Sequence, residues 1–315
     1  MQIAIPLGLG VFLIWYVYQS FTPSQIAETK LFFSTANYGF VAISVVLSLL
    51  SHLSRAYRWD FMLEPLGYKT KLPNNFMAIS VAYLMNLFLP KSGEVSRAII
   101  LDKYEKVPFQ KGFGTIISER LVDLLFLLIF TILALILKFD VLYDFVMDSI
   151  PASALYIILG GIIAVAILIP LYLKFSKSNV NKKIKGFIMG LKEGVFSILN
   201  MRKKKAFIVQ SLIIWGLYLL SFYTALQALP ETSVLPIGTV IIVFVVGSFT
   251  FAFTNSGFGT YPAAIAGILT VFGIAKTAGI AFGWIAWISN ISSIILFGIL
   301  SMIFLPIYNR KRLIS

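Results

Sequence analysis

Long apolar stretches, separated by short basic segments, dominate this sequence. A helix needs about 20 apolar residues to cross a bilayer, and six stretches reach or approach that length: 2–18, 37–56, 115–138, 151–173, 206–229 and 277–305. Of the 315 residues, 59% are hydrophobic and only 12% are charged. A water-soluble domain of this size cannot bury so much apolar surface. The sequence therefore predicts an all-α, polytopic bundle of transmembrane helices.

Two further apolar stretches are interrupted by residues that break helices. The first covers 76–104 and is broken at 89–93, and the second covers 236–273 and is broken at 255–262. Non-helical backbone is tolerated at membrane depth only where protein or a wet cavity covers its free N–H and C=O groups. Both breaks therefore predict a polar cavity inside the protein. Each stretch is either a re-entrant segment or a pair of full spans joined by a loop.

The order of the stretches predicts an inverted repeat within one transmembrane domain, 1–315. A span, a broken segment and a second span follow one another in 37–138, and the same plan recurs in the opposite orientation in 206–305. Paired interruptions at matching places in two inverted halves are typical of a transporter binding site. The basic, amphipathic linker 174–205 lies between the halves, either as a plain connector or as a helix on an anionic membrane surface.

The distribution of basic residues predicts the topology. With a cytoplasmic N-terminus, 23 of the 26 Lys and Arg residues fall on the cytoplasmic side, as the positive-inside rule requires. We therefore expect a multi-pass protein of the cell (inner or plasma) membrane with both termini in the cytoplasm. This distribution also accounts for the basicity without nucleic acid as a partner. The chain has no Cys and one His, so no metal site and no cofactor are expected.

Charged residues beside or within the predicted spans are the first candidates for a substrate site, since they are costly there unless paired or wetted. Five cations and three carboxylates gather near one membrane face: Arg55, Arg58, Lys91, Glu94, Arg97, Glu119, Arg120 and Asp123. Arg side chains can bind a phosphate while carboxylates hold them in place. The alternative is interfacial snorkelling with structural ion pairs. The nearby His52 is expected to be a hydrogen-bonded helix residue.

The second break offers neutral groups in place of charges. Asn255 and Ser256 can form hydrogen bonds, and Gly257 and Gly259 allow the backbone to approach closely. We expect these four residues to form a neutral outer gate that also contacts the substrate. Valine at both glycines is expected to abolish transport in a protein that still folds.

Three segments resemble a known family. They are Arg55-x-x-Arg58-Trp59, residues 86–98 (NLFLPKSGEVSRA) and residues 118–124 (SERLVDL), and they are similar to the membrane region of bacterial lysyl-phosphatidylglycerol synthases, which also occurs in stand-alone, flippase-like proteins. That family often has Pro-Gly-Gly-x-Gly followed by Glu at its later break. Here Asn255-Ser256-Gly257-Phe258-Gly259 precedes Pro262, and no Glu follows.

The resemblance implies translocation of a lipid with a polar head, such as an aminoacylated phosphatidylglycerol or a polyprenyl-linked glycolipid. We expect a stand-alone flippase without the soluble synthase domain and without enzymatic activity. Two alternatives stay open. One is a membrane-embedded lipid-modifying enzyme that uses Glu119 or Asp123 as a base or Mg²⁺ ligand, and the other is a partner subunit of a separate lipid synthase. A homo-oligomer is also compatible with the sequence.

Overall fold

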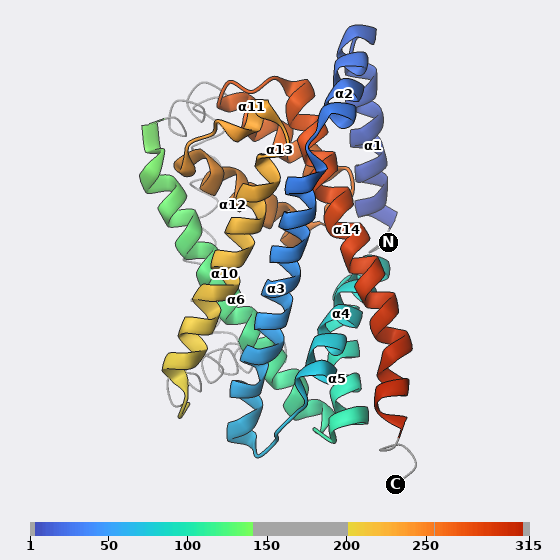
Figure 1. The fold of residues 1–315 in the computed structure, drawn as a ribbon, viewed down its shortest axis with the longest axis vertical. Helices are drawn as coiled ribbons and strands as arrows, with labels where there is room; N and C mark the ends of the chain where they lie inside the picture. The colour runs from blue at the N-terminus through green and yellow to red at the C-terminus, as the bar shows by residue number, and fades with distance from the viewer. Residues whose placement is uncertain (1–3, 141–200, 255, 311–315) are drawn as a thin grey trace, which may run out of the picture.

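The computed structural model describes residues 4–140, 201–254 and 256–310, and in these ranges it contains helices and connecting turns but no β-strand (Figure 1). The helices are α1 (Ala4–Ser20), α2 (Pro23–Thr35), α3 (Tyr38–Leu63), the 3₁₀ turn η1 (Glu64–Leu66), α4 (Leu72–Phe88), α5 (Ser92–Glu105), α6 (Phe109–Leu137), α10 (Lys204–Leu226), α11 (Pro230–Ser233), α12 (Ile237–Phe253), α13 (Thr260–Val271) and α14 (Lys276–Tyr308). The predicted span 151–173 and most of the linker 174–205 lie outside the described residues.

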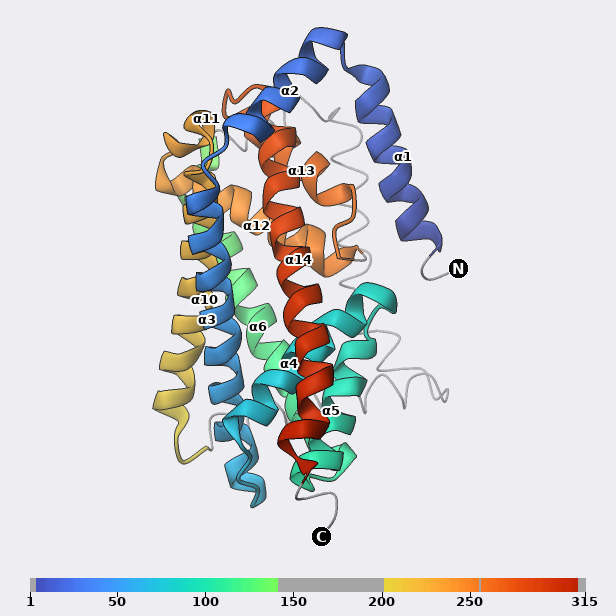
Figure 2. The ribbon, with the colours of Figure 1, turned by 45° about the vertical axis from the view of Figure 1, so that its right-hand side comes forward.

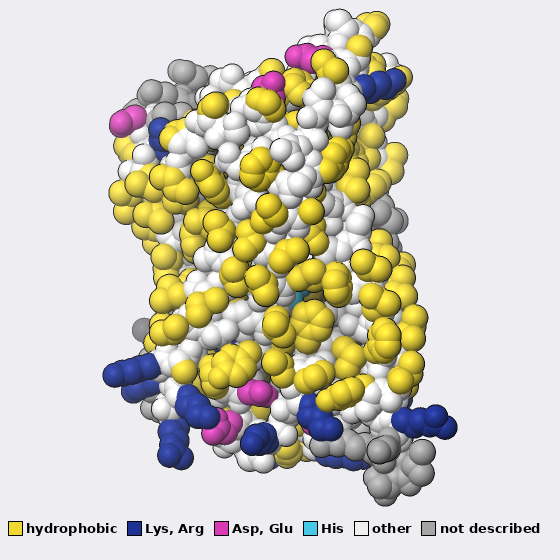
Figure 3. Space-filling view, in the orientation of Figure 1, with side chains coloured by type: hydrophobic (Ala, Val, Ile, Leu, Met, Phe, Trp, Pro, Cys, Tyr) yellow, Lys and Arg dark blue, Asp and Glu magenta, His cyan; other side chains and the backbone are white. Residues whose placement is uncertain are grey.

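Four of the described helices, α3, α6, α10 and α14, are long and apolar enough to cross a membrane. Their outward side chains are hydrophobic, as Ile136 of α6 illustrates at 71% exposure. Figure 3 shows these side chains as a broad hydrophobic belt between two ends that carry the charges. The prediction of an all-α membrane bundle is confirmed.

The two ends of the bundle differ in charge. Lys and Arg gather at the lower end in Figure 3, which we call the basic end. Helices α3 and α14 run toward this end, whereas α6 and α10 run away from it (Figure 1). These directions agree with the predicted alternation of the spans, while the assignment of the basic end to the cytoplasm stays a prediction.

The first interrupted stretch is a re-entrant hairpin. Helix α4 rises from the basic end, and α5 returns to the same end (Figure 2). The turn between them requires a left-handed backbone at Lys91, with φ of 64°. The amide of Gly93 donates to Asn86 Oδ1 at 2.8 Å, and the Ser92 hydroxyl donates to the Met85 carbonyl at 3.0 Å. These bonds satisfy backbone groups that no helix completes.

The second interrupted stretch repeats this design from the opposite end, with α12 running inward and α13 returning (Figure 2). Its turn has positive φ at Ser256, Gly257 and Gly259. The Ser256 carbonyl accepts a hydrogen bond of 2.8 Å from the indole of Trp287. Asn255, which was predicted to contribute to this turn, lies outside the described residues.

Each hairpin packs against the last long helix of the other half. Helix α4 lies along α14, and α12 lies along α6, while α3 and α10 pack against each other. The contact of α4 with α14 is tight, because a Cβ atom added to Gly298 would lie 2.5 Å from Leu84 Cβ. This reciprocal packing is what an inverted repeat produces. The boundaries predicted for the two halves stay a prediction.

The N-terminal part departs from the expected full span over 2–18. Helix α1 covers nearly these residues, but it starts near mid-height of the bundle (Figure 2). The unpredicted helix α2 follows, and a capping box between Thr22 and Gln25 begins it. Helix α1 lies on the second hairpin, where Gly10 closely approaches Phe258 and Gly259.

Replacing Gly259 by Val is expected to displace α1 and lower the melting temperature. Its φ of +66° is strained for Val by about 1–3 kcal/mol, and a Cβ atom would lie 2.4 Å from the Gly10 carbonyl oxygen. This close approach argues against the expectation that a protein with Val at both glycines still folds, and that expectation stays a prediction. The control is Gly267→Val in α13, where a Cβ atom meets nothing within 4 Å. Equal melting temperatures of the two variants in detergent would contradict the close contact between Gly259 and α1.

Candidate functional site

Seven charged residues from three helices form one network of ion pairs, which we call the charge cluster. Helix α3 supplies two arginines, α5 supplies a glutamate and an arginine, and α6 supplies the rest. The members are Arg55, Arg58, Glu94, Arg97, Glu119, Arg120 and Asp123. The structure thus brings together seven of the eight charged residues that the sequence singled out.

Glu119 is the centre of the charge cluster. Its carboxylate pairs with Arg55, with Arg58 at 3.2 Å and with Arg97 at 2.9 Å. The side chains of all four residues are at most 3% exposed. One carboxylate therefore holds two arginines of α3 and one of the first hairpin against α6. Since buried charges are tolerated only with partners, these contacts fix the arrangement of the three helices.

Asp123 lies one turn beyond Glu119 on the same face of α6. Its carboxylate is 2.6 Å from Arg55 and 3.2 Å from Arg58, and Arg120 lies 3.7 Å away. The arginines of α3 are also one turn apart, so two carboxylates on one helix meet two guanidinium groups on the other. The sequence predicted this spacing, but it could not show that the two pairs face each other.

Aromatic and hydroxyl groups that the sequence did not predict as part of the site surround the arginines. The Arg97 guanidinium lies 3.6 Å from the centre of the Trp59 ring, a favourable cation–π geometry. Arg58 donates to the Ser211 hydroxyl at 2.8 Å, and Arg55 donates to the Tyr218 hydroxyl at 3.2 Å. Because Trp59 directly follows Arg58, the sequence could have predicted an aromatic ring near the arginines. It could not have predicted the contacts with α10, whose residues lie more than 150 positions away in the chain.

His52 was expected to be a hydrogen-bonded helix residue, and it does lie in α3, but its ring makes a different contact. Its ring stacks on Tyr83 of α4, with the ring centres 4.6 Å apart. Among the described residues, none forms a hydrogen bond with the imidazole. His52 lies one turn before Arg55, so this ring pair borders the charge cluster.

The charge cluster has an exposed edge formed by Arg120 and Glu94. The Arg120 side chain is 39% exposed and the Glu94 side chain 22%, and the two are 3.2 Å apart. Lys91 stands exposed at the turn of the first hairpin and has no ion pair with any described residue. These three residues are the part of the predicted charged site that an approaching group can reach.

The buried arginines are paired with carboxylates in this conformation, and their predicted role in phosphate binding stays a prediction. Arg55, Arg58 and Arg97 were expected to bind phosphate, but in this structure Glu119 and Asp123 occupy them and protein covers them. Removing charges from water is costly unless they pair. The Nε atoms of these three arginines and Nη2 of Arg97 nevertheless have no hydrogen-bond partner in the described structure. In this conformation the three arginines hold α3 and α5 against α6, the helix that carries Arg120.

The turn of the second hairpin remains separate from the charge cluster. Ser256 accepts from Trp287, Gly257 donates to Thr254 at 3.2 Å, and Gly259 lies against α1. Within the described parts of the chain, no hydrogen bond or ion pair joins this turn to the charge cluster. The two predicted parts of the site are therefore not one contact site in this conformation.

The charge cluster contains four guanidinium groups and three carboxylates, so its formal net charge is +1. At the exposed edge, Arg120 can donate to a phosphate and Glu94 can accept from an ammonium group. No group of three or more His, Asp or Glu residues that could hold a metal ion occurs in the described ranges. This chemistry suits a polar head that carries an anion, with or without a cation.

Comparisons with known proteins place the chain among membrane proteins. The model of the lysylphosphatidylglycerol synthase TM region matches residues 3–298. Among curated relatives, UPF0104 membrane protein MJ1595 of Methanocaldococcus jannaschii is 30% identical over 99 residues, which are 30% of each chain. UPF0104 membrane protein PH1989 of Pyrococcus horikoshii is 25% identical over 256 residues, covering 70% of this chain and 71% of the relative.

A third relative is an enzyme. Glycosyltransferase AglD of Haloferax volcanii is 31% identical over 104 residues, which are 33% of this chain and 16% of AglD. The matches to MJ1595 and AglD thus span less than a third of those proteins. No solved structure matches. Because the family model spans nearly the whole sequence, the chain belongs to the lysylphosphatidylglycerol synthase transmembrane-region family.

Proposed function

We propose that this protein translocates a lipid with a polar head across the cell membrane, with both its termini in the cytoplasm. The cargo is a phospholipid or related lipid, such as an aminoacylated phosphatidylglycerol or a polyprenyl-linked glycolipid. The observation that carries the proposal is the pair of opposed re-entrant hairpins, of which the first ends beside the charge cluster.

The physical problem of lipid translocation matches this architecture. A polar head can cross the hydrocarbon layer only along a polar path, and two hairpins that enter from opposite ends supply polar turns inside the bundle. The first turn lies next to Arg120 and Glu94, and the second turn carries neutral hydroxyl and backbone groups. In this scheme the head binds at the exposed edge and leaves past the second turn.

The roles of the charged residues follow from their exposure. Arg120 would bind the phosphate, and Glu94 would bind an amino group where the head carries one, with Lys91 adding positive charge at the turn. Glu119 would hold the three buried arginines, so that α6 presents Arg120 at a fixed place. An aminoacylated head, which carries both phosphate and ammonium groups, complements the Arg120–Glu94 pair.

The main alternative is a lipid-modifying enzyme with Glu119 or Asp123 as its base. Both carboxylates accept two or more ion pairs from arginines, which disfavours proton uptake by either of them. The similarity of part of the chain to AglD also fits a partner of a lipid-modifying enzyme. Translocation accounts better for the two hairpins, and we therefore favour it.

Replacing Arg120 by Gln is expected to slow lipid translocation by about tenfold or more, since a hydrogen bond to a charged group contributes about 1.5–3 kcal/mol. The measurement is the protection of fluorescent NBD-phosphatidylglycerol from dithionite in proteoliposomes. Arg202→Gln is the matched control, because Arg202 is exposed at the basic end and pairs with no described residue. Equal translocation rates for the two variants would contradict a role of Arg120 in binding the lipid head.

A further inference from the structure

We propose that a groove between α3 and α4 seats an acyl chain of the cargo lipid, so that the lipid enters sideways from the membrane. The lipid head is directed through the groove's inner end to a small chamber at His52. The identity of the occupant as cargo rests on the proposed translocation, whereas the groove and the chamber are features of the structure.

The groove opens on the hydrophobic belt. It has a volume of about 300 Å³, and its lining is entirely apolar: Val46, Leu49, Leu50 and Leu53 of α3 and Phe76 of α4. Val46 is 55% exposed and Leu50 is 45% exposed. An apolar hollow that faces hydrocarbon is filled by the surrounding lipid chains, since water has no partners there.

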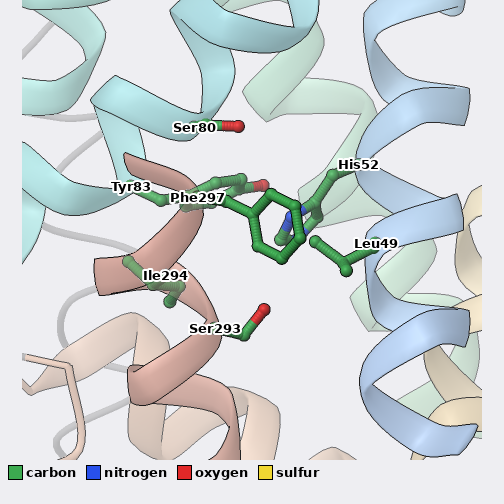
Figure 4. Close-up of a pocket in the computed structure, with 7 residues that line it drawn as sticks. All are labelled: Leu49, His52, Ser80, Tyr83, Ser293, Ile294 and Phe297. Carbon is green, nitrogen blue, oxygen red and sulfur yellow. The ribbon is translucent and has the colours of Figure 1, made fainter. Parts of the chain in front are cut away.

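The chamber adjoins the groove at Leu49, which lines both. Its other lining residues come from three helices and include polar ones: His52, Ser80, Tyr83, Ser293, Ile294 and Phe297 (Figure 4). Its volume of about 10 Å³ has room for about one water. An apolar groove on the lipid side and this small chamber therefore share one wall residue, Leu49.

His52 can also be reached from the lipid-facing surface of the protein. The cyan of the chain's single histidine shows through the hydrophobic belt in Figure 3. Polar side chains that lipid can reach are costly and are rarely placed there without a function. Because the imidazole has no hydrogen-bond partner among the described residues, its nitrogens are free to bond a lipid head.

Phe297 closes the chamber in this conformation. Its ring extends from α14 toward Leu49 and His52 of α3 (Figure 4). Helix α14 is held tightly to α4 by the contact of Gly298 with Leu84. The chamber can therefore widen most easily by separation of α3 from α14, which would draw the Phe297 ring away from His52.

The chamber also borders the charge cluster. His52 lies one turn before Arg55 on α3, and its ring centre is 6.4 Å from that of Tyr218, which accepts the hydrogen bond from Arg55. A head that passes His52 and Tyr83 therefore arrives beside the guanidinium groups. In this proposal, groove, chamber and cluster become one route when α3 separates from α14.

The binding test fills the groove with larger side chains. Val46→Trp combined with Leu50→Trp occupies it, and Ile129→Trp combined with Leu133→Trp is the control on α6, where both residues are exposed to lipid at the same i, i+4 spacing. Each protein is reconstituted with phosphatidylglycerol and phosphatidylethanolamine, extracted and examined by native mass spectrometry. We expect the wild type and the control to retain one phospholipid, and the filled variant about tenfold less. Equal retention would overturn the proposal.

The same proteins are then assayed for NBD-phosphatidylglycerol translocation. Loss of retention together with slower translocation supports entry through the groove, whereas loss of retention with unchanged translocation overturns it. If the wild type retains lipid in the groove but translocates none, the proposed function fails and the lipid site stands. Phe297→Ala provides a second variant with a milder change. It is expected to widen the chamber and to speed NBD-phosphatidylglycerol translocation severalfold, and an unchanged rate counts against the route.

Discussion

Replacing Glu119 by Gln is expected to destabilise the protein by about 3–5 kcal/mol, the usual effect of breaking a buried ion pair by removing one partner. The substitution leaves Arg55, Arg58 and Arg97 buried with Asp123 as their remaining carboxylate, and Arg97 then has no ion pair at all among the described residues. The measurement is reversible unfolding in mixed dodecylmaltoside and SDS micelles, followed by circular dichroism.

Two controls separate this effect from a general loss of charge. Glu94→Gln removes a carboxylate that is 22% exposed and is expected to change the unfolding free energy by about 0–1 kcal/mol. Adding Arg97→Met to Glu119→Gln removes the orphaned charge and places a flexible apolar chain on Trp59. The double variant is expected to recover about 1 kcal/mol or more. If Glu119→Gln and Glu94→Gln were equally stable, Glu119 would not be the centre of the cluster.

Replacing Gly298 by Leu is expected to force α14 away from α4 and to destabilise the protein by about 1–3 kcal/mol or more, as over-packing does. A Cβ atom at this position would lie 2.5 Å from Leu84 Cβ and 2.9 Å from its Cδ2 atom. Because this contact joins the first hairpin to the other half, translocation is expected to fall as well. The unfolding assay above provides the measurement.

Gly216→Leu is the control for this substitution. Gly216 lies exposed on α10, and a Cβ atom there would meet nothing within 4 Å. This variant is expected to match the wild type in both stability and translocation. Equal stability of Gly298→Leu and Gly216→Leu would show that the packing of α14 on α4 tolerates a larger separation than the close approach implies.

Much of the fold could be predicted because lipid imposes simple rules. The lengths of α3, α6, α10 and α14 follow from the thickness of the bilayer, and the breaks at Pro90 and Gly257 mark where helices stop. The sequence alone left open whether the broken stretches cross the membrane. That outcome depends on the packing of α4 on α14 and of α12 on α6, which involves residues far apart in the chain.

The sequence predicted which charged residues belong to the candidate site, but not which partner each of them meets. Spacing of one turn placed Glu119 with Asp123 and Arg55 with Arg58 on shared helix faces. Whether an arginine meets a carboxylate or a lipid depends on which faces of α3, α5 and α6 meet. Ser211, Tyr218 and Phe297 belong to the second half and carry no local signal, since an aromatic or hydroxyl residue in an apolar span is most often part of the packing.

Translocation by the purified wild-type protein is the most direct test of the central claim. In liposomes that contain NBD-phosphatidylglycerol in both leaflets, dithionite reduces the outer label at once and the inner label only after it has crossed. With this protein present, nearly all of the label is expected to be reduced, whereas protein-free vesicles keep their inner-leaflet label. A protected half that stays the same with and without the protein, and with an aminoacylated lipid as well, would contradict translocation.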